Sequence, residues 1–144
     1  MISFADSSAL VKLYADEPEH EPVRALERIV VAQIARVEVP AALWRKQRTG
    51  ELSVAEAALL VAQFEADWFG TEEDIRRFEV VRMAAAVIED AARLTGAHRL
   101  RAYDAVQLAS ARAVRTADPE ITRFAAFDHT LRDAAAADGF TAIP

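Results

Sequence analysis

The chain has 144 residues, 53% of them hydrophobic, and a formal net charge of −6. This length and composition suffice for one domain, residues 1–144, and exclude a disordered chain, while the negative charge disfavours binding to a polyanion unless bound cations offset it. The absence of cysteine excludes disulfides and thiolate metal ligands. The sequence has no apolar run long enough to cross a membrane and no recognisable signal peptide. We therefore expect a cytoplasmic protein without membrane partners.

Short apolar runs, typical of buried strands, alternate with amphipathic stretches, typical of helices. In chain order the sequence predicts a strand over 2–5, helices over 7–15 and 19–27, a strand over 29–32, helices over 35–49 and 54–68, a short strand over 78–81, helices over 83–95 and 100–114, a strand over 123–127, a helix over 131–138 and an edge strand over 141–143. This alternation predicts an α/β fold, with a small parallel sheet flanked by helices on both faces in three layers.

Individual residues mark several of the helix ends. Ser53-Val54-Ala55-Glu56 is a capping box, which opens a helix. Gly50 and Gly96 are predicted to end the helices that precede them. Since Pro40 is tolerated in a helix only near the first turn, we expect Glu38 to lie close to a helix N-terminus.

Two of the predicted strands run into an aspartate, Asp6 in the first case and Asp128 in the second. The carboxyl ends of parallel strands meet at one edge of a sheet, where ligands bind. Glu38 and Asp104 begin helices that we expect at the same edge. Together the four acids would make an oxygen-only pocket for a hard divalent cation, and without a cation their charges would repel.

Each acid also has a structural interpretation when it is taken alone. Asp6 and Asp128 are suitable helix N-caps, and Glu38 could be an ordinary exposed glutamate. Asp104 lies in a helix whose neighbouring Tyr103 we expect to be mostly buried. His129 is expected to be a bystander, and no serine or cysteine stands in a setting typical of a nucleophile.

At these acids the sequence resembles PIN-domain ribonucleases, in the branch of the VapC toxins of toxin–antitoxin pairs. Asp6–Tyr14 resembles the opening motif of the family and Leu100–Ala111 its third acidic motif. Val37-Glu38-Val39 and Phe124–Leu131 resemble the second and fourth motifs, so the similarity spans essentially the whole chain.

The resemblance implies a Mg²⁺- or Mn²⁺-dependent endoribonuclease. Asp6 and Asp104 would be the primary metal ligands, Glu38 and Asp128 would complete the catalytic site directly or through water, and Ser8 would orient Asp6 or a water. The ion would activate water for attack on phosphorus, which leaves a 5′-phosphate and a 3′-hydroxyl. The implied partners are an RNA substrate, a cognate antitoxin and a second copy of the chain in a homodimer.

Two departures from the family pattern keep an alternative open. Gln33-Ile34 replaces a frequent serine or threonine before the second motif, and Phe127 replaces a small hydroxyl residue before Asp128. The alternative is a PIN fold that acts as a binding module with an impaired metal site. In either case, seven basic residues in or beside the motifs could contact nucleic-acid phosphates: Lys12, Arg36, Arg45, Lys46, Arg48, Arg99 and Arg101.

Overall fold

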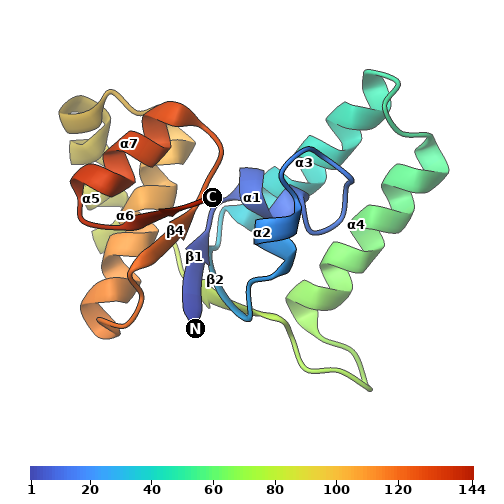
Figure 1. Cartoon of the computed structure of the whole chain (residues 1–144), viewed down its shortest axis with the longest axis horizontal. Coiled ribbons are helices and arrows are strands. Elements are labelled where there is room, and N and C mark those ends of the chain that lie inside the picture. Colours follow the sequence, from blue (N-terminus) through green and yellow to red (C-terminus); the bar gives the residue numbers. More distant parts are fainter.

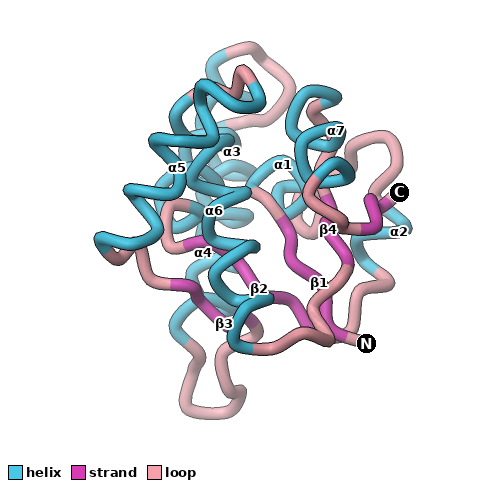
Figure 2. The backbone as a smooth tube through the Cα atoms, turned by 90° about the vertical axis from the view of Figure 1, so that its left-hand side faces the viewer, coloured by secondary structure: helices cyan, strands magenta, loops and turns pink.

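The computed structural model describes residues 1–144, and at its centre five parallel strands form one sheet in the order β3-β2-β1-β4-β5. Figure 2 shows β3, β2, β1 and β4 side by side. The strands are β1 (Ile2–Ala5), β2 (Arg28–Ala32), β3 (Phe78–Val81), β4 (Arg123–Ala125) and β5 (Thr141–Ile143). The small parallel sheet that the sequence predicts is therefore confirmed, and β5 is an edge strand as expected.

Helices cover both faces of this sheet, which confirms the three-layer α/β/α arrangement (Figure 1). One face carries α1 (Ser7–Val11), α2 (Glu21–Arg24), α3 (Ala35–Arg48) and α4 (Val54–Phe69), and the other carries α5 (Ala85–His98), α6 (Ala102–Ala117) and α7 (His129–Ala137). None of these helices combines the length and the apolar character that crossing a bilayer requires.

The alternation of side chains along the strands explains why both faces are covered. In β2, Val30 and Ala32 point into the core with α5, α6 and α7, whereas Ile29 and Val31 point into the core with the N-terminal helices. All four side chains are at most 1% exposed. A strand that is apolar on both sides needs a layer of helices on each, as is usual for parallel sheets.

Several predicted helix ends differ from the structure. The helix α1 ends at Val11 rather than near Ala15, because the backbone tightens into i→i−3 hydrogen bonds at Lys12, Leu13 and Tyr14. The prediction that Gly96 ends a helix is wrong, since α5 continues through it to His98. Arg99, with φ of 55°, is the left-handed residue that terminates α5.

The order of the strands places a topological switch point at the centre of the sheet. From β1 the chain moves outward to β2 and β3 on one side, and it later returns to add β4 and β5 on the other. In open α/β sheets, ligands bind in the crevice outside the carboxyl ends of the strands at such a point. Asp6 follows β1, and Asp128 comes three residues after β4, so these two aspartates flank the crevice.

Candidate metal centre

Asp6 is the most buried of the four predicted acids, with 3% of the residue exposed. It caps α1, and its Oδ1 accepts hydrogen bonds from the backbone N–H of Ala9 at 2.9 Å and the Ser8 hydroxyl at 2.7 Å. The backbone N–H of Asp6 donates to the carbonyl of Ala125 at 3.0 Å, which ties the end of β1 to β4. The carboxylate is therefore fixed in place by its own turn and by the neighbouring strand.

Glu38 lies in the first turn of α3, as expected, and is held from two other elements. Its Oε1 accepts hydrogen bonds from the Ser7 hydroxyl of α1 at 2.9 Å and from Nε2 of Gln107 in α6 at 2.8 Å. Gln107 is buried, and its Oε1 has no hydrogen-bond partner. Helix α3 and helix α6 thus meet through polar groups at this point, and one oxygen acceptor beside Glu38 remains unsatisfied.

Asp104 and Asp128 share one cationic neighbour, Arg101. Nε of Arg101 donates to Oδ2 of Asp104 at 3.1 Å, and its terminal nitrogen lies 3.8 Å from Oδ1 of Asp128. Asp128 also caps α7, because its Oδ2 accepts from the backbone N–H of Leu131 at 3.0 Å. Asp104 lies in the first turn of α6, with 18% of its side chain exposed.

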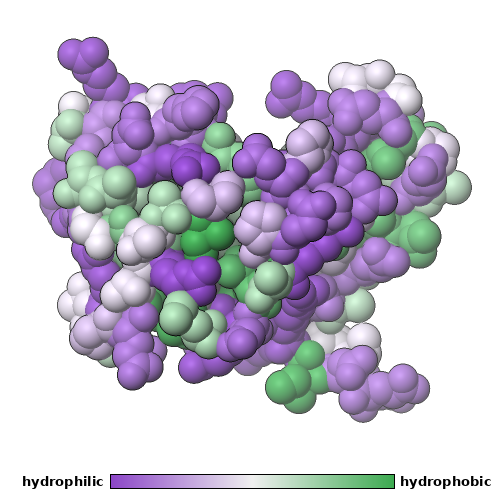
Figure 3. All heavy atoms as spheres, viewed as in Figure 1, coloured by the Kyte–Doolittle hydropathy of each residue, from purple (hydrophilic) through white to green (hydrophobic).

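All four predicted acids line a single cavity of about 480 Å³. It opens between α3 and the N-terminal end of α6, and Figure 3 shows the surface hollowed at the top of the molecule, with hydrophilic side chains around the hollow. Ser7, Ser8, Gln107, Arg45, Arg48, Arg101 and Tyr103 also line it. The structure therefore brings together residues that are far apart in the sequence, at the edge of the sheet where the strand order reverses.

The charges in this cavity are poorly balanced around Asp6. Burial raises its pKa from the ordinary 3.8 to about 7; the hydrogen bonds from Ser8 and Ala9 lower the pKa, and the negative charges of Asp104 and Glu38 raise it further. No lysine or arginine pairs with Asp6, whereas Arg101 pairs with Asp104. A cation close to Asp6 would favour the ionised form of this buried carboxyl.

The donor set suits a hard divalent cation, although the acids are not yet gathered around one. No three acidic or histidine side chains in the chain lie close enough together to hold a metal ion as they stand. The four carboxylates in the lining, the buried Asp6 without a cationic partner and the unsatisfied Oε1 of Gln107 are nevertheless features that suit Mg²⁺ or Mn²⁺. Of the four carboxylates, Asp104 and Asp128 are the two that Arg101 engages.

Sequence reasoning missed two features of this cavity. Gln107 was not singled out, although its spacing of three residues from Asp104 places both on one face of α6. Tyr103 was expected to be mostly buried, and that prediction is wrong, because the residue is 59% exposed and lines the cavity. Every residue of α6 from Ala105 to Ala111 is buried, so the buried part of the helix begins two residues after Tyr103.

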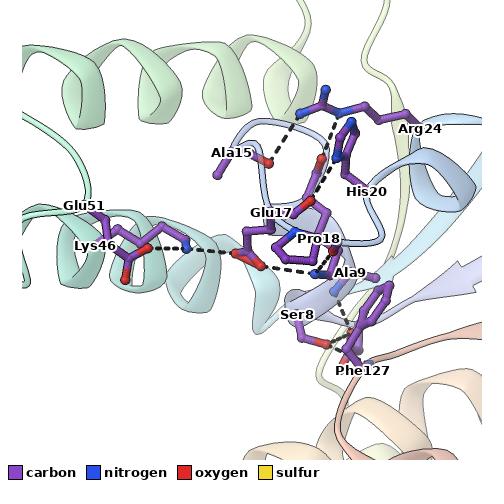
Figure 4. A network of polar contacts seen from close by, with 12 residues as sticks. Ser8, Ala9, Ala15, Glu17, Pro18, His20, Arg24, Lys46, Glu51 and Phe127 are labelled. Carbon is purple, nitrogen blue, oxygen red and sulfur yellow. Dashed lines mark hydrogen bonds and ion pairs between the residues drawn. The ribbon is translucent and has the colours of Figure 1, made fainter.

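A larger cavity of about 590 Å³ lies between α4 and the loop after α1, but all of its charged side chains except Glu56 are already in ion pairs. Lys46 binds Glu17 and Glu51, both at 3.0 Å, as Figure 4 shows. Lys12 is buried, with Nζ 3.2 Å from Glu17 and 2.7 Å from the carbonyl oxygen of Pro18. Both lysines are therefore engaged by groups of the loop after α1 or by Glu51, and they stabilise that loop.

The two departures from the family pattern have structural explanations outside the acid cavity. Oε1 of Gln33 accepts from the backbone N–H of Met83 at 2.9 Å and so links the ends of β2 and β3. The ring of Phe127 lies 4.2 Å from Nζ of Lys12, and its backbone N–H donates to the Ser8 hydroxyl at 3.2 Å. Neither side chain lines the cavity, so neither blocks it.

Comparisons with known proteins agree with this fold. The family model described as PIN domain matches residues 3–137. Among curated proteins, Ribonuclease VapC45 and Ribonuclease VapC49, both from Mycobacterium tuberculosis, are each 34% identical to the chain over 145 residues, which cover 98% of this chain and 94% of theirs.

Solved structures show the same fold at lower identity. The VapC20 structure from Mycobacterium tuberculosis, described as a Sarcin-Ricin loop cleaving toxin, is similar with a TM-score of 0.65 and 18% identity, over 96% of each chain. PAE2754 from Pyrobaculum aerophilum has a TM-score of 0.60 and 19% identity, over 93% of this chain and 79% of its own. A toxin–antitoxin complex from Klebsiella pneumoniae has a TM-score of 0.55 and 15% identity, over 88% and 86%.

Proposed function

Because this chain belongs to the PIN domain family, among the VapC ribonucleases, we propose that it is a metal-dependent endoribonuclease and the toxin of a toxin–antitoxin pair. The observation that carries the proposal is the convergence of Asp6, Glu38, Asp104 and Asp128 on one cavity at the switch point of the sheet. Asp6 and Asp104 are the proposed primary ligands of Mg²⁺ or Mn²⁺, and Glu38 and Asp128 complete the set. A bound ion would supply an activated water and would neutralise charge on the phosphoryl oxygens.

The residues of the chain have separate tasks in this proposal. Ser8 and the N–H of Ala9 hold Oδ1 of Asp6, so the buried carboxylate keeps one orientation while ions and substrate exchange. Ser7 and Gln107 hold Glu38 in the same way. Positioning of this kind matters because small displacements of a catalytic group are costly in rate.

Of the seven basic residues suggested by the sequence, four pair with carboxylates in the structure: Lys12, Arg36, Lys46 and Arg101. Arg36 pairs with Glu65, and the two lysines near the motifs are paired as described above. Arg45 and Arg48 of α3 line the acid cavity and have no carboxylate partner. We propose that these two arginines bind RNA phosphates beside the acids, since guanidinium groups bind phosphate with two parallel hydrogen bonds.

An antitoxin and a second copy of the chain are also proposed as partners. The VapC names of the curated relatives and the structural neighbour from a toxin–antitoxin complex support the antitoxin. A small gene beside the one that encodes this chain, whose product copurifies with it, is the cheapest test of that partner. The homodimer rests on the family resemblance alone, and light scattering of the purified chain tests it.

The first experiment on the proposed activity uses the purified chain without any partner. It is expected to cleave single-stranded RNA in Mg²⁺ or Mn²⁺, to lose cleavage in EDTA and to recover when the ion is restored. Sequencing of the product ends should find 5′-phosphates and 3′-hydroxyls, because an activated water rather than the 2′-hydroxyl attacks. Cleavage that persists in EDTA, or products with 2′,3′-cyclic phosphates, would contradict the proposal and favour contamination or another mechanism.

A further inference from the structure

Arg101 is the one cation that directly pairs with the acids of the cavity. Its guanidinium contacts Oδ2 of Asp104 at 3.1 Å and Oδ1 of Asp128 at 3.8 Å. The other two acids are held by neutral donors only, Asp6 by Ser8 and Ala9 and Glu38 by Ser7 and Gln107. A single positive charge thus stands between two of the four proposed metal ligands, Asp104 and Asp128.

Arg101 is held there only by these acids. Its side chain is 80% exposed, in contrast to 18% for Asp104, so little packing fixes it in place. Exposed ion pairs between single charges are weak, whereas a divalent cation attracts each carboxylate about twice as strongly at equal distance. The Coulomb attraction therefore favours exchange of the guanidinium for a divalent ion, and the exchange requires only a turn of one exposed side chain.

Arg101 would stay at the cavity after such an exchange. Arg101 is the N-cap residue of α6, and Tyr103 lies in the first turn of that helix. Both residues line the cavity. Arg45 and Arg48 line the same cavity from α3. A guanidinium released from Asp104 would therefore lie near these two arginines at the cavity. There it could bind a phosphate group of the RNA, because the carboxylates would be occupied by the metal ion.

We infer that Arg101 is an internal counter-ion, which pairs with Asp104 and Asp128 until a divalent cation displaces it and which then binds the RNA backbone. The inference rests on the proposed function, because it takes the acids to be metal ligands. Arg101 would then have opposite effects on two affinities. It lowers the affinity for the metal ion, with which it competes, and raises the affinity for RNA.

The test is a calorimetric titration of the full chain with Mn²⁺ alone. Arg101→Gln is expected to bind Mn²⁺ about five- to tenfold more tightly than the unmodified chain, because the competing cation is gone. Arg45→Gln is the matched control, since it removes the same charge from the same cavity but breaks no pair with an acid. We expect the control to change Mn²⁺ affinity less than threefold, which separates displacement from a general change in charge.

The second measurement uses RNA. At saturating Mn²⁺, Arg101→Gln should raise KM for a single-stranded RNA about fivefold with little change in kcat, so the variant gains metal affinity and loses RNA affinity. A residue with a role in packing alone would not combine tighter Mn²⁺ binding with a raised KM for RNA. Unchanged or weaker Mn²⁺ binding by Arg101→Gln, or a gain no larger than that of Arg45→Gln, would overturn the inference and leave the proposed function intact. Failure of the unmodified chain to bind Mn²⁺ would overturn both.

Discussion

Asp6→Asn is expected to lower metal-dependent RNA cleavage by about a thousandfold or more, equivalent to ~4 kcal/mol in the barrier. Asparagine has nearly the same shape, and its Oδ1 can still accept from Ser8 and from the N–H of Ala9, since both hydrogen bonds end on Oδ1 of Asp6. The variant therefore keeps the turn but loses the buried negative charge. Rates measured with a fluorogenic RNA at saturating Mg²⁺ would show the loss.

A control for this variant comes from the same fold. Asp133 of α7 is exposed and does not line the acid cavity, so Asp133→Asn should leave the cleavage rate within about twofold. Circular dichroism of both variants should match that of the unmodified chain. A correctly folded Asp6→Asn protein that cleaves RNA at the original rate would show that Asp6 is only a helix cap.

The same substitution should stabilise the protein when no divalent ion is present. The pKa of Asp6 rises from 3.8 to about 7 on folding, mainly because the carboxyl is buried, so the folded state holds the proton more tightly than the unfolded state. The stability contributed by the protonated group is complete below about pH 4 and is lost as the pH rises through about 7. Asp6→Asn removes this loss, and at about pH 8 it should raise the free energy of unfolding by roughly 2–4 kcal/mol.

Urea unfolding in EDTA at about pH 5 and about pH 8 measures this difference. The gain from Asp6→Asn should be large at the higher pH and small at the lower one. In saturating Mn²⁺ the unmodified chain should be the more stable of the two. An ion that binds only the folded state stabilises it, and the variant binds the ion less tightly because it lacks one ligand. A variant that is less stable than the unmodified chain in EDTA at about pH 8 would contradict the account.

Much of the fold follows from local patterns in the sequence. Ile29–Ala32 is apolar at every position, which predicts a strand covered on both faces, and the capping box at Ser53 places the start of α4 correctly. The end of α5 was not predictable in this way, because Gly96 is compatible with a helix when packing continues it, and Leu94 and Leu100 are buried on either side. At Gly96, core packing therefore outweighs the low helix propensity of glycine.

The site was predictable only in part. The placement of Asp6 and Asp128 after strands indicates the edge of the sheet, but only the strand order, with β4 beside β1, brings the two acids to one crevice. Contacts formed on folding also decide which cations are paired. Lys12 turns inward to Glu17 and Pro18, which its position in the opening motif does not reveal. The pairing of Arg101 with Asp104 is local, three residues apart, and could have been anticipated.

The most direct test of the shared metal site is anomalous diffraction from crystals of the chain soaked in Mn²⁺. The account predicts a manganese peak inside the acid cavity, at coordination distance from carboxylate oxygens of Asp6 and Asp104, and no such peak in Asp6→Asn crystals. A peak elsewhere on the molecule, or a cavity that stays free of manganese while Arg101 remains paired with Asp104, would contradict it.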